Sequence, residues 1–329
     1  MMGRLVVAGL VGLCAVVVLA PDLLRLERFA PFAEMLALRP MAAVCLLLVA
    51  VGIVVAQPGW WPSAAALAAI ALAAAMFVLF SRVVPSGFAR ALNFASGQPT
   101  LSVLSFNVFD GQADVPSLGY TIAAERPDLV VLPEAGERYR QLLLTYIGGL
   151  GYHSWTTGRP QEPDVNGVVV LAAPSMGALR AQVLDAHAKF AWIELSGGRL
   201  GGVRLVGVHT AAPVSGSVPA WRADLEALAT WCQHTATPIV LAGDFNATLD
   251  HRELRSLGCT DVAAAVGRGL TGTWPTSLPA WLGVQIDHVL VGGGITPSGA
   301  RVLNLPGSDH RAVLARVTLP DEPAPGPSQ

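Results

Sequence analysis

The first 82 residues contain three long apolar stretches, and these constrain the fold more than any other feature of the sequence. The stretches are Leu5–Ala20, Leu36–Ala56 and Trp61–Phe80. A helix needs about 20 mainly apolar residues to cross a bilayer, and these stretches offer too few polar positions to form a solvated face. Charged residues make up only 13% of the chain, against about 25% in an average soluble domain. The sequence therefore predicts a membrane region over residues 1–90, with about three transmembrane helices near 5–22, 36–56 and 61–80.

The first stretch has a second interpretation. It is the shortest of the three and follows Arg4, as a secretory signal peptide would. Its exit reads Leu-Ala-Pro-Asp, which is a poor cleavage site, so a retained helix is the preferred prediction. Trp60 and Trp61 lie in a tight turn before the third stretch, where a membrane interface favours indole rings.

The sequence leaves the side of the membrane open. Five arginines follow the first or the third stretch: Arg25, Arg28, Arg39, Arg82 and Arg90. The positive-inside rule would place them, and the rest of the chain, on the cytoplasmic side of a multi-pass cell-membrane protein. Against this stand the signal-like start and Cys232 and Cys259, which can pair only in an oxidising space. Spacing alone does not show whether they pair.

From residue 99 to residue 319 the sequence predicts one α/β domain. Seven short β-branched runs alternate with Gly, Pro and polar breaks: Leu101–Phe106, Leu129–Leu132, Val168–Leu171, Val203–Val208, Ile239–Leu241, Val289–Val291 and Ala312–Val317. Helix-like segments lie between them at Ser117–Glu125, Glu137–Ile147 and Ala220–His234. Such a length of mixed strand and helix suits one layered domain. The proline-rich end, 320–329, is predicted to be a disordered tail.

Polar side chains stand at the ends of the predicted strands, where active sites of sheet proteins collect. Oxygen ligands for a hard cation are available in Asn107, Glu134 and Asp309. Asp244 is a candidate base for a water nucleophile. Donors to a developing negative charge are available in His209, Asn246 and His310, and Asp287 is the candidate carboxylate partner of His310. These residue types in this pattern predict phosphoryl transfer to water.

The motifs that carry these residues resemble those of the endonuclease/exonuclease/phosphatase superfamily. In order they are Ser-Phe-Asn-Val (105–108), Pro-Asp-Leu-Val-Val-Leu-Pro-Glu (127–134), Val-His-Thr (208–210), Gly-Asp-Phe-Asn (243–246), Ile-Asp-His (286–288) and Gly-Ser-Asp-His (307–310). The resemblance implies a deoxyribonuclease I-like two-sheet α/β sandwich with Mg²⁺ or Mn²⁺ as cofactor. It also implies metal binding by Asn107 and Glu134, with Asp309 near the metal. Many members carry Gln before the metal-binding Glu, where this chain has Pro133.

For the remaining residues of this pattern, the resemblance implies roles around the water and the phosphate. Asp244 and Asn246 would lie around both, Asp287 and His310 would form a dyad, and His209 would contact the phosphate. His288 is expected to point to the opposite face of its strand and to be structural, because neighbouring strand residues alternate.

The expected function is hydrolysis of a phosphodiester or phosphomonoester by a membrane-anchored enzyme. The partners are a lipid bilayer and a substrate that is nucleic acid, a lipid headgroup or a small molecule. Residues 99–320 carry 15 Lys+Arg against 18 Asp+Glu, whereas duplex nucleic acid is normally held by a cationic surplus. The alternative is a non-catalytic binding or signalling module on the same fold. It predicts missing ligands, and none is missing.

Overall fold

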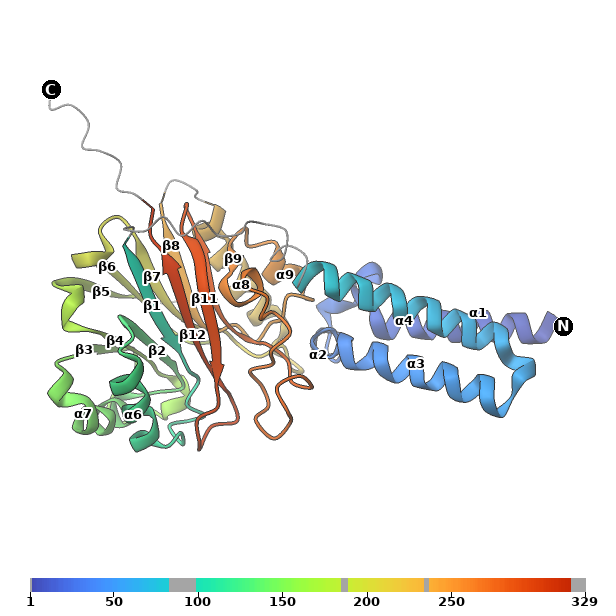
Figure 1. Cartoon of the computed structure of the whole chain (residues 1–329), viewed down its shortest axis with the longest axis horizontal. Helices are drawn as coiled ribbons and strands as arrows, with labels where there is room; N and C mark the ends of the chain where they lie inside the picture. The colour runs from blue at the N-terminus through green and yellow to red at the C-terminus, as the bar shows by residue number, and fades with distance from the viewer. Residues whose placement is uncertain (1, 83–98, 185–188, 234–236, 321–329) are drawn as a thin grey trace, which may run out of the picture.

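The computed structural model describes residues 2–82, 99–184, 189–233 and 237–320 of the chain. A β-rich body holds the later residues, and a slender group of helices projects from one end of it along the longest axis of the molecule (Figure 1). The expected tail, 320–329, lies outside the described residues except for Pro320.

Three apolar helices form the projecting group: α1 (Met2–Leu19), α3 (Arg39–Ala56) and α4 (Trp61–Arg82). Small side chains, among them Ala15, Ala50 and Ala64, pack where the helices meet, and this lets their backbones approach closely. The connection from α1 to α3 contains two short 3₁₀ turns and α2 (Phe32–Ala37). Large apolar side chains on the helices face outward, with Leu48 67% and Val55 76% exposed.

Within the described residues, one of the three expected spans meets the length and hydropathy of a membrane-crossing helix. It is Arg39–Ala56, with a mean hydropathy of 2.3. The apolar parts of the other two are shorter, Val6–Leu19 and Trp61–Phe77. Because α1 ends before Pro21, its apolar part rises only about 20 Å at 1.5 Å per residue, less than the roughly 30 Å hydrocarbon core. The prediction of three spans is therefore corrected to one candidate span among N-terminal helices.

The body is a sandwich of two six-stranded sheets. The first sheet has the order β11-β12-β1-β2-β4-β3 and the second the order β5-β6-β7-β8-β10-β9. The strands of the first are β11 (Thr296–Leu303), β12 (Ala312–Thr318), β1 (Thr100–Ser105), β2 (Leu129–Pro133), β4 (Val168–Ala172) and β3 (His153–Thr156). The strands of the second are β5 (Leu179–Leu184), β6 (Trp192–Gly197), β7 (Arg204–His209), β8 (Ile239–Asp244), β10 (Asp287–Gly292) and β9 (Thr260–Asp261).

The described part of the body has five α-helices: α6 (Val115–Glu125), α7 (Glu137–Ile147), α8 (Val218–Gln233), α9 (Arg252–Arg255) and α10 (Val262–Ala265). Apolar residues of α6 and α7, such as Leu118 and Leu143, pack on the outer face of the first sheet. Those of α8, such as Trp221 and Leu228, pack on the outer face of the second. The two-sheet α/β sandwich expected from the sequence is confirmed.

The sheets bury a common apolar core between them, to which Val103, Val131, Leu205 and Val240 contribute. They approach closely at Gly207, where an added Cβ would lie 2.8 Å from Val170 Cγ2. In each sheet one central pair is parallel, β1 with β2 and β7 with β8. The carboxyl ends of parallel strands meet at one edge of a sheet, so the residues after these four strands collect at one edge of the sandwich.

Two features tie distant parts of the chain together. Cys232, at the end of α8, forms a disulfide with Cys259, with 5.1 Å between their Cα atoms. The sequence had left this pairing open. The helical region contacts the body through His251, whose Nε2 lies 2.8 Å from the carbonyl oxygen of Ala33. Beside it the guanidinium of Arg255 lies over the ring of Phe77 at 5.0 Å.

Candidate functional site

Three site residues from three strands meet around one amide group. The Nδ2 of Asn107, just beyond β1, donates to Glu134 Oε1 and to Asp244 Oδ2, each at 2.9 Å. Glu134 follows β2 with a φ of 59°, a left-handed backbone that is costly for a side chain of this size and is retained mainly at functional sites. Its other oxygen accepts the backbone N–H of Asp110 at 2.8 Å. These hydrogen bonds fix the side chains of Asn107, Glu134 and Asp244 relative to one another.

Asp287 and His310 form a buried pair beside this centre. Asp287 opens β10 opposite Asp244 of β8, and its Oδ2 lies 2.9 Å from His310 Nδ1. The other ring nitrogen of His310 faces Asp244 Oδ2 at 3.9 Å and Asp309 Oδ1 at 3.8 Å. Burial works to lower the pKa of His310, but these carboxylates outweigh it and raise the pKa to about 10. The imidazole is therefore cationic and presents its N–H to the site.

Burial and the nearby Asp287 raise the pKa of Asp244 to about 7. Its Oδ1 accepts the backbone N–H of Asn246 at 2.8 Å, while its Oδ2 receives Asn107. A carboxylate whose pKa lies near neutrality can accept a proton at ordinary pH and release it again. Asp244 thus has the environment of a general base.

His209 and Asn246 lie beside the same centre. His209 ends β7 and stacks on Phe190 with ring centroids 4.0 Å apart. Burial and the neighbouring cations His310 and Lys189 lower the pKa of His209 to about 3, so the ring is neutral. Its Nδ1 has no hydrogen-bond partner among the described residues. Asn246 adopts a φ of 46° and donates to the carbonyl of Thr210 at 3.1 Å.

The donor set fits a hard divalent cation. There are two groups of residues whose potential ligand atoms all lie within 4.8 Å of one another. The first is Glu134 with His209 and Asp244, and the second is Asp244 with Asp287 and His310. The Asn107 amide N–H lies between two carboxylate oxygens, where positive charge is stabilised. Its Oδ1 accepts the backbone N–H of Phe109 at 2.9 Å and has a second lone pair for a cation. Glu134, Asn107 and Asp244 are therefore the residues best placed around such an ion.

Asp309 is held slightly apart from that group. Its Oδ2 accepts the indole N–H of Trp274 at 2.9 Å, and its Oδ1 is buried with no hydrogen-bond partner among the described residues. The structure thus brings all eight predicted site residues to one edge of the sandwich. Their individual roles remain predictions.

Sequence reasoning missed three residues that support the site. Ser308 donates to the Asn107 carbonyl at 2.7 Å and accepts the His310 N–H at 3.0 Å, so it ties the last loop to β1. Phe190 and Trp274 contact site residues through their rings. Ser308 stands within the Gly-Ser-Asp-His motif, so its position was a usable signal, whereas nothing in the sequence singles out the other two.

His288, the immediate neighbour of Asp287, points away from the site as alternation requires. Its ring nitrogens face Asp261 Oδ2 at 2.6 Å and the carbonyl of Ala247 at 2.8 Å. This second buried Asp–His pair is a natural control for the first.

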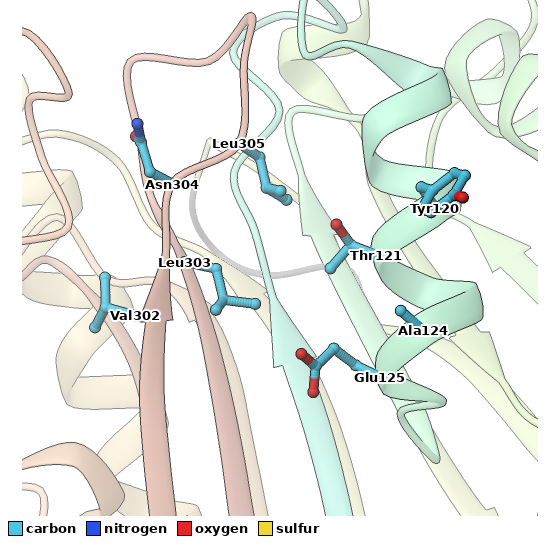
Figure 2. Close-up of a pocket in the computed structure, with 8 residues that line it drawn as sticks. All are labelled: Tyr120, Thr121, Ala124, Glu125, Val302, Leu303, Asn304 and Leu305. Carbon is cyan, nitrogen blue, oxygen red and sulfur yellow. The ribbon is translucent and has the colours of Figure 1, made fainter.

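A separate depression of ≈ 350 Å³ lies between α6 and the end of β11 (Figure 2). Leu303 and Leu305 are among its lining residues, and its only charged lining residue, Glu125, is paired with Arg301 at 2.9 Å. None of the eight site residues lines it. The depression therefore has no part in the chemistry proposed for the strand-end site.

Comparisons with known proteins agree with this geometry. The profile of the Endonuclease/Exonuclease/phosphatase family matches residues 104–310. A family protein from Leptotrichia buccalis superposes with a TM-score of 0.53 at 15% identity, over 67% of this chain and 100% of its own. A humanised TDP2 from D. rerio gives 0.54 at 17% identity, over 67% and 99%. D. rerio TDP2 complexed with a single-strand DNA product gives 0.52 at 16% identity, over 67% and 99%.

Comparison with curated protein sequences gives no match. At these identities the solved structures establish the fold alone, whereas the family profile covers more than half of the chain and spans the motifs from β1 to His310. The chain belongs to the endonuclease/exonuclease/phosphatase family and is a metal-dependent hydrolase of phosphoester bonds.

Proposed function

We propose that this chain is a membrane-anchored phosphoesterase that uses Mg²⁺ or Mn²⁺. The observation that carries the chemical part is the Asn107 amide held between Glu134 and Asp244, beside the Asp287–His310 pair. Glu134 and Asn107 would hold the ion, with Asp309 near it. When bound, the ion would neutralise phosphate charge and lower the pKa of a water.

The protein's own groups would divide the remaining work. Asp244 would take a proton from the attacking water, since its buried carboxylate lies between Asn107 and His310 at the same centre. The cationic His310, oriented by Asp287, would donate its Nε2–H to the phosphoryl group as negative charge develops. Asn246 and the neutral His209 would bind the other phosphate oxygens.

Membrane anchoring is supported by the outward-facing apolar surface of the helices. The candidate span, α3, has only 17% of its residues buried, and long apolar side chains face outward on α1, α3 and α4. Water would leave this surface poorly solvated, whereas acyl chains would cover it.

The disulfide supports an oxidising location for the catalytic domain, because such bonds are rare in reducing compartments. Arg39, one of the arginines that favoured the cytoplasm, is buried. Its guanidinium lies 2.5 Å from Asp22 and 3.8 Å from Asp250, so its positive charge has a structural role inside the protein. We therefore propose that the domain lies on the extracytoplasmic side.

The test is hydrolysis of bis-p-nitrophenyl phosphate, a soluble diester, by the full chain in detergent, with Mg²⁺ or Mn²⁺ and with EDTA. We expect metal-dependent turnover that Glu134→Gln and His310→Gln each reduce by on the order of 10²-fold or more. His288→Gln is the matched control, since it removes a buried imidazole paired with an aspartate outside the site. Equal losses in His310→Gln and His288→Gln would mean that only stability had been lost, and the proposed roles would fail.

A further inference from the structure

One loop beside the site combines large exposed apolar side chains with a complete lack of charge. Residues 270–283, which we call the tryptophan loop, contain no Asp, Glu, Lys or Arg. Leu270 is 44% exposed, Leu278 38% and Trp281 76%. An isolated exposed apolar side chain is ordinary, but a cluster of them marks a surface that meets an apolar partner.

The loop is held firmly, so this exposure is not the result of a loose segment. The buried guanidinium of Arg311 donates to the carbonyl oxygens of Gly272, Pro275, Thr276 and Leu278 at 3.3, 3.1, 3.3 and 2.5 Å. The backbone segments at the two ends of the loop are in contact, since a Cβ on Gly272 would lie 2.3 Å from the carbonyl carbon of Gly283. These contacts fix the backbone of the loop from which the apolar side chains project.

The tryptophan loop also touches the site directly. The indole N–H of Trp274 donates to Asp309 Oδ2 at 2.9 Å, and the backbone N–H of Thr276 donates to the Asp309 carbonyl at 2.8 Å. Two further loops at the same edge expose Phe109 and Val214, 39% and 48%. Of the ten large apolar side chains exposed on the described part of the domain, six thus stand in loops at the site edge. A substrate entering the site would pass an apolar rim.

The position of the loop relative to the helices indicates what that rim meets. The apolar helices run along the longest axis of the molecule, and the orange loop that follows α10 lies at the end of the body nearer to them (Figure 1). At this same end His251 and Arg255 contact the helical region. If the helix axes follow the bilayer normal, the loop faces the membrane surface.

We propose that the tryptophan loop enters the headgroup layer of the bilayer and that the substrate is a membrane phospholipid, whose phosphoester reaches the site from that surface. This proposal rests on the proposed function. In the reaction the oxygen of a water forms a bond to phosphorus, one ester P–O bond breaks, and the departing oxygen takes up a proton. An uncharged loop with exposed indole and leucine side chains is typical of contact with a membrane interface.

Single-stranded nucleic acid is the competing substrate for exposed indoles, since bases stack on them. Such sites combine the aromatic rings with a cationic groove along the backbone. Here the loop has no charged residue, and residues 99–320 carry more acidic than basic residues, 18 against 15. The charges of this chain therefore favour the lipid.

The experiment compares lipid and soluble substrates with the full chain reconstituted in vesicles. The vesicles contain phosphatidylcholine and phosphatidylglycerol, with sphingomyelin or phosphatidylinositol added in parallel, and headgroup release is measured by mass spectrometry. The variant is Leu278→Ser with Trp281→Ser, since neither side chain touches the site. Tyr120→Ser is the matched control, because Tyr120 is an aromatic residue 82% exposed on α6, beside the depression in Figure 2.

We expect the double variant to lose about tenfold or more of the lipid turnover, since burial of two such side chains contributes at least that much. Turnover of bis-p-nitrophenyl phosphate should stay within about twofold of wild type, and Tyr120→Ser should match wild type on both substrates. Equal lipid turnover in wild type and the double variant would overturn the role of the loop.

Further outcomes distinguish failure of the proposed lipid substrate from failure of the proposed phosphoesterase activity. Hydrolysis of the soluble diester without hydrolysis of any lipid would overturn the lipid substrate and leave the phosphoesterase intact. Cleavage of single-stranded DNA or RNA oligonucleotides that falls in the double variant would assign the loop to base stacking instead. If wild type hydrolyses nothing, the proposed function itself fails. Quenching of tryptophan emission by brominated phosphatidylcholine, reduced in Trp281→Phe, then still reports whether the loop enters the bilayer.

Discussion

Removing the disulfide should destabilise the catalytic domain by a definite amount. Cys232 and Cys259 are 27 residues apart, and the chain-entropy relation gives about 3.5 kcal/mol for closing a loop of that length. Cys232 is buried at 4% exposure among apolar residues that include Leu228 and Leu257. Replacing its sulfur with a hydrogen adds about 1 kcal/mol of lost burial. The variant Cys232→Ala with Cys259→Ala should therefore lose about 4.5 kcal/mol of unfolding free energy.

The assay is guanidinium unfolding of the full chain in detergent, followed by tryptophan fluorescence. Trp221 is fully buried beneath the second sheet, so its emission reports the loss of this half of the sandwich. The control is Cys14→Ser with Cys45→Ser, which removes the two free, exposed cysteines and leaves the bridge. That control should unfold at the same guanidinium concentration as wild type.

Two results would refute this reasoning. Denatured, unreduced wild type should show two titratable thiols, from Cys14 and Cys45, and four would show that no bridge forms. A loss below about 1 kcal/mol in the double alanine variant would show that the bridge does not restrict the unfolded chain as the loop length requires. The first result would also remove the support for an oxidising compartment.

Three further predictions concern single groups. Asp287→Asn should reduce turnover by on the order of 10²-fold or more, measured by steady-state hydrolysis, because His310 loses the carboxylate that orients and charges it. Asp224→Asn should stabilise the domain by about 1–3 kcal/mol at pH 7, since burial raises the pKa of Asp224 from 3.8 to about 6. Between pH 3.8 and about pH 6 the unfolding free energy of wild type should fall as the pH rises, because the folded state still binds the proton that the unfolded chain has released. Thermal unfolding of Asp224→Asn should not show this fall. Glu134→Gln should raise the Mg²⁺ or Mn²⁺ concentration needed for half-maximal activity by about 10–100-fold, measured by metal titration.

The sequence predicted the central strands because burial on both faces requires continuous apolar runs. All seven predicted runs coincide with strands, and each of these lies inside its sheet. The five missed strands comprise the four sheet edges and β6, next to an edge. The edge strands β11 and β5 are largely half-exposed or exposed along their length, so they carry Gly, Pro, Arg and Gln where an interior strand would carry Val or Ile. Their pairing depends on neighbours that are distant in sequence.

The candidate site was predictable to the extent that its residues follow strands. Six motifs stand at strand ends, and parallel pairing of β1 with β2 and of β7 with β8 brings four of them to one edge. The mutual geometry was not predictable. That Asp244 contacts Asn107 and also faces His310 depends on how closely the two sheets approach, which Gly207 permits. The stacking of Phe190 on His209 depends on the pairing of β6 with β7 in the second sheet, and no motif in the sequence indicates it.

One segment joins the chemistry, the covalent bridge and the helical region. The chain between β8 and β9 begins with Asp244 and Asn246 in the site and ends at Cys259 in the disulfide. Between them His251 contacts the Ala33 carbonyl through Nε2, while its Nδ1 accepts the backbone N–H of Thr248 at 2.9 Å. Because one imidazole serves both contacts, its tautomer is fixed, with the proton on Nε2. The turn that follows Asn246 is thereby held against the N-terminal helices, so displacement of those helices should shift the residues at the carboxyl end of β8.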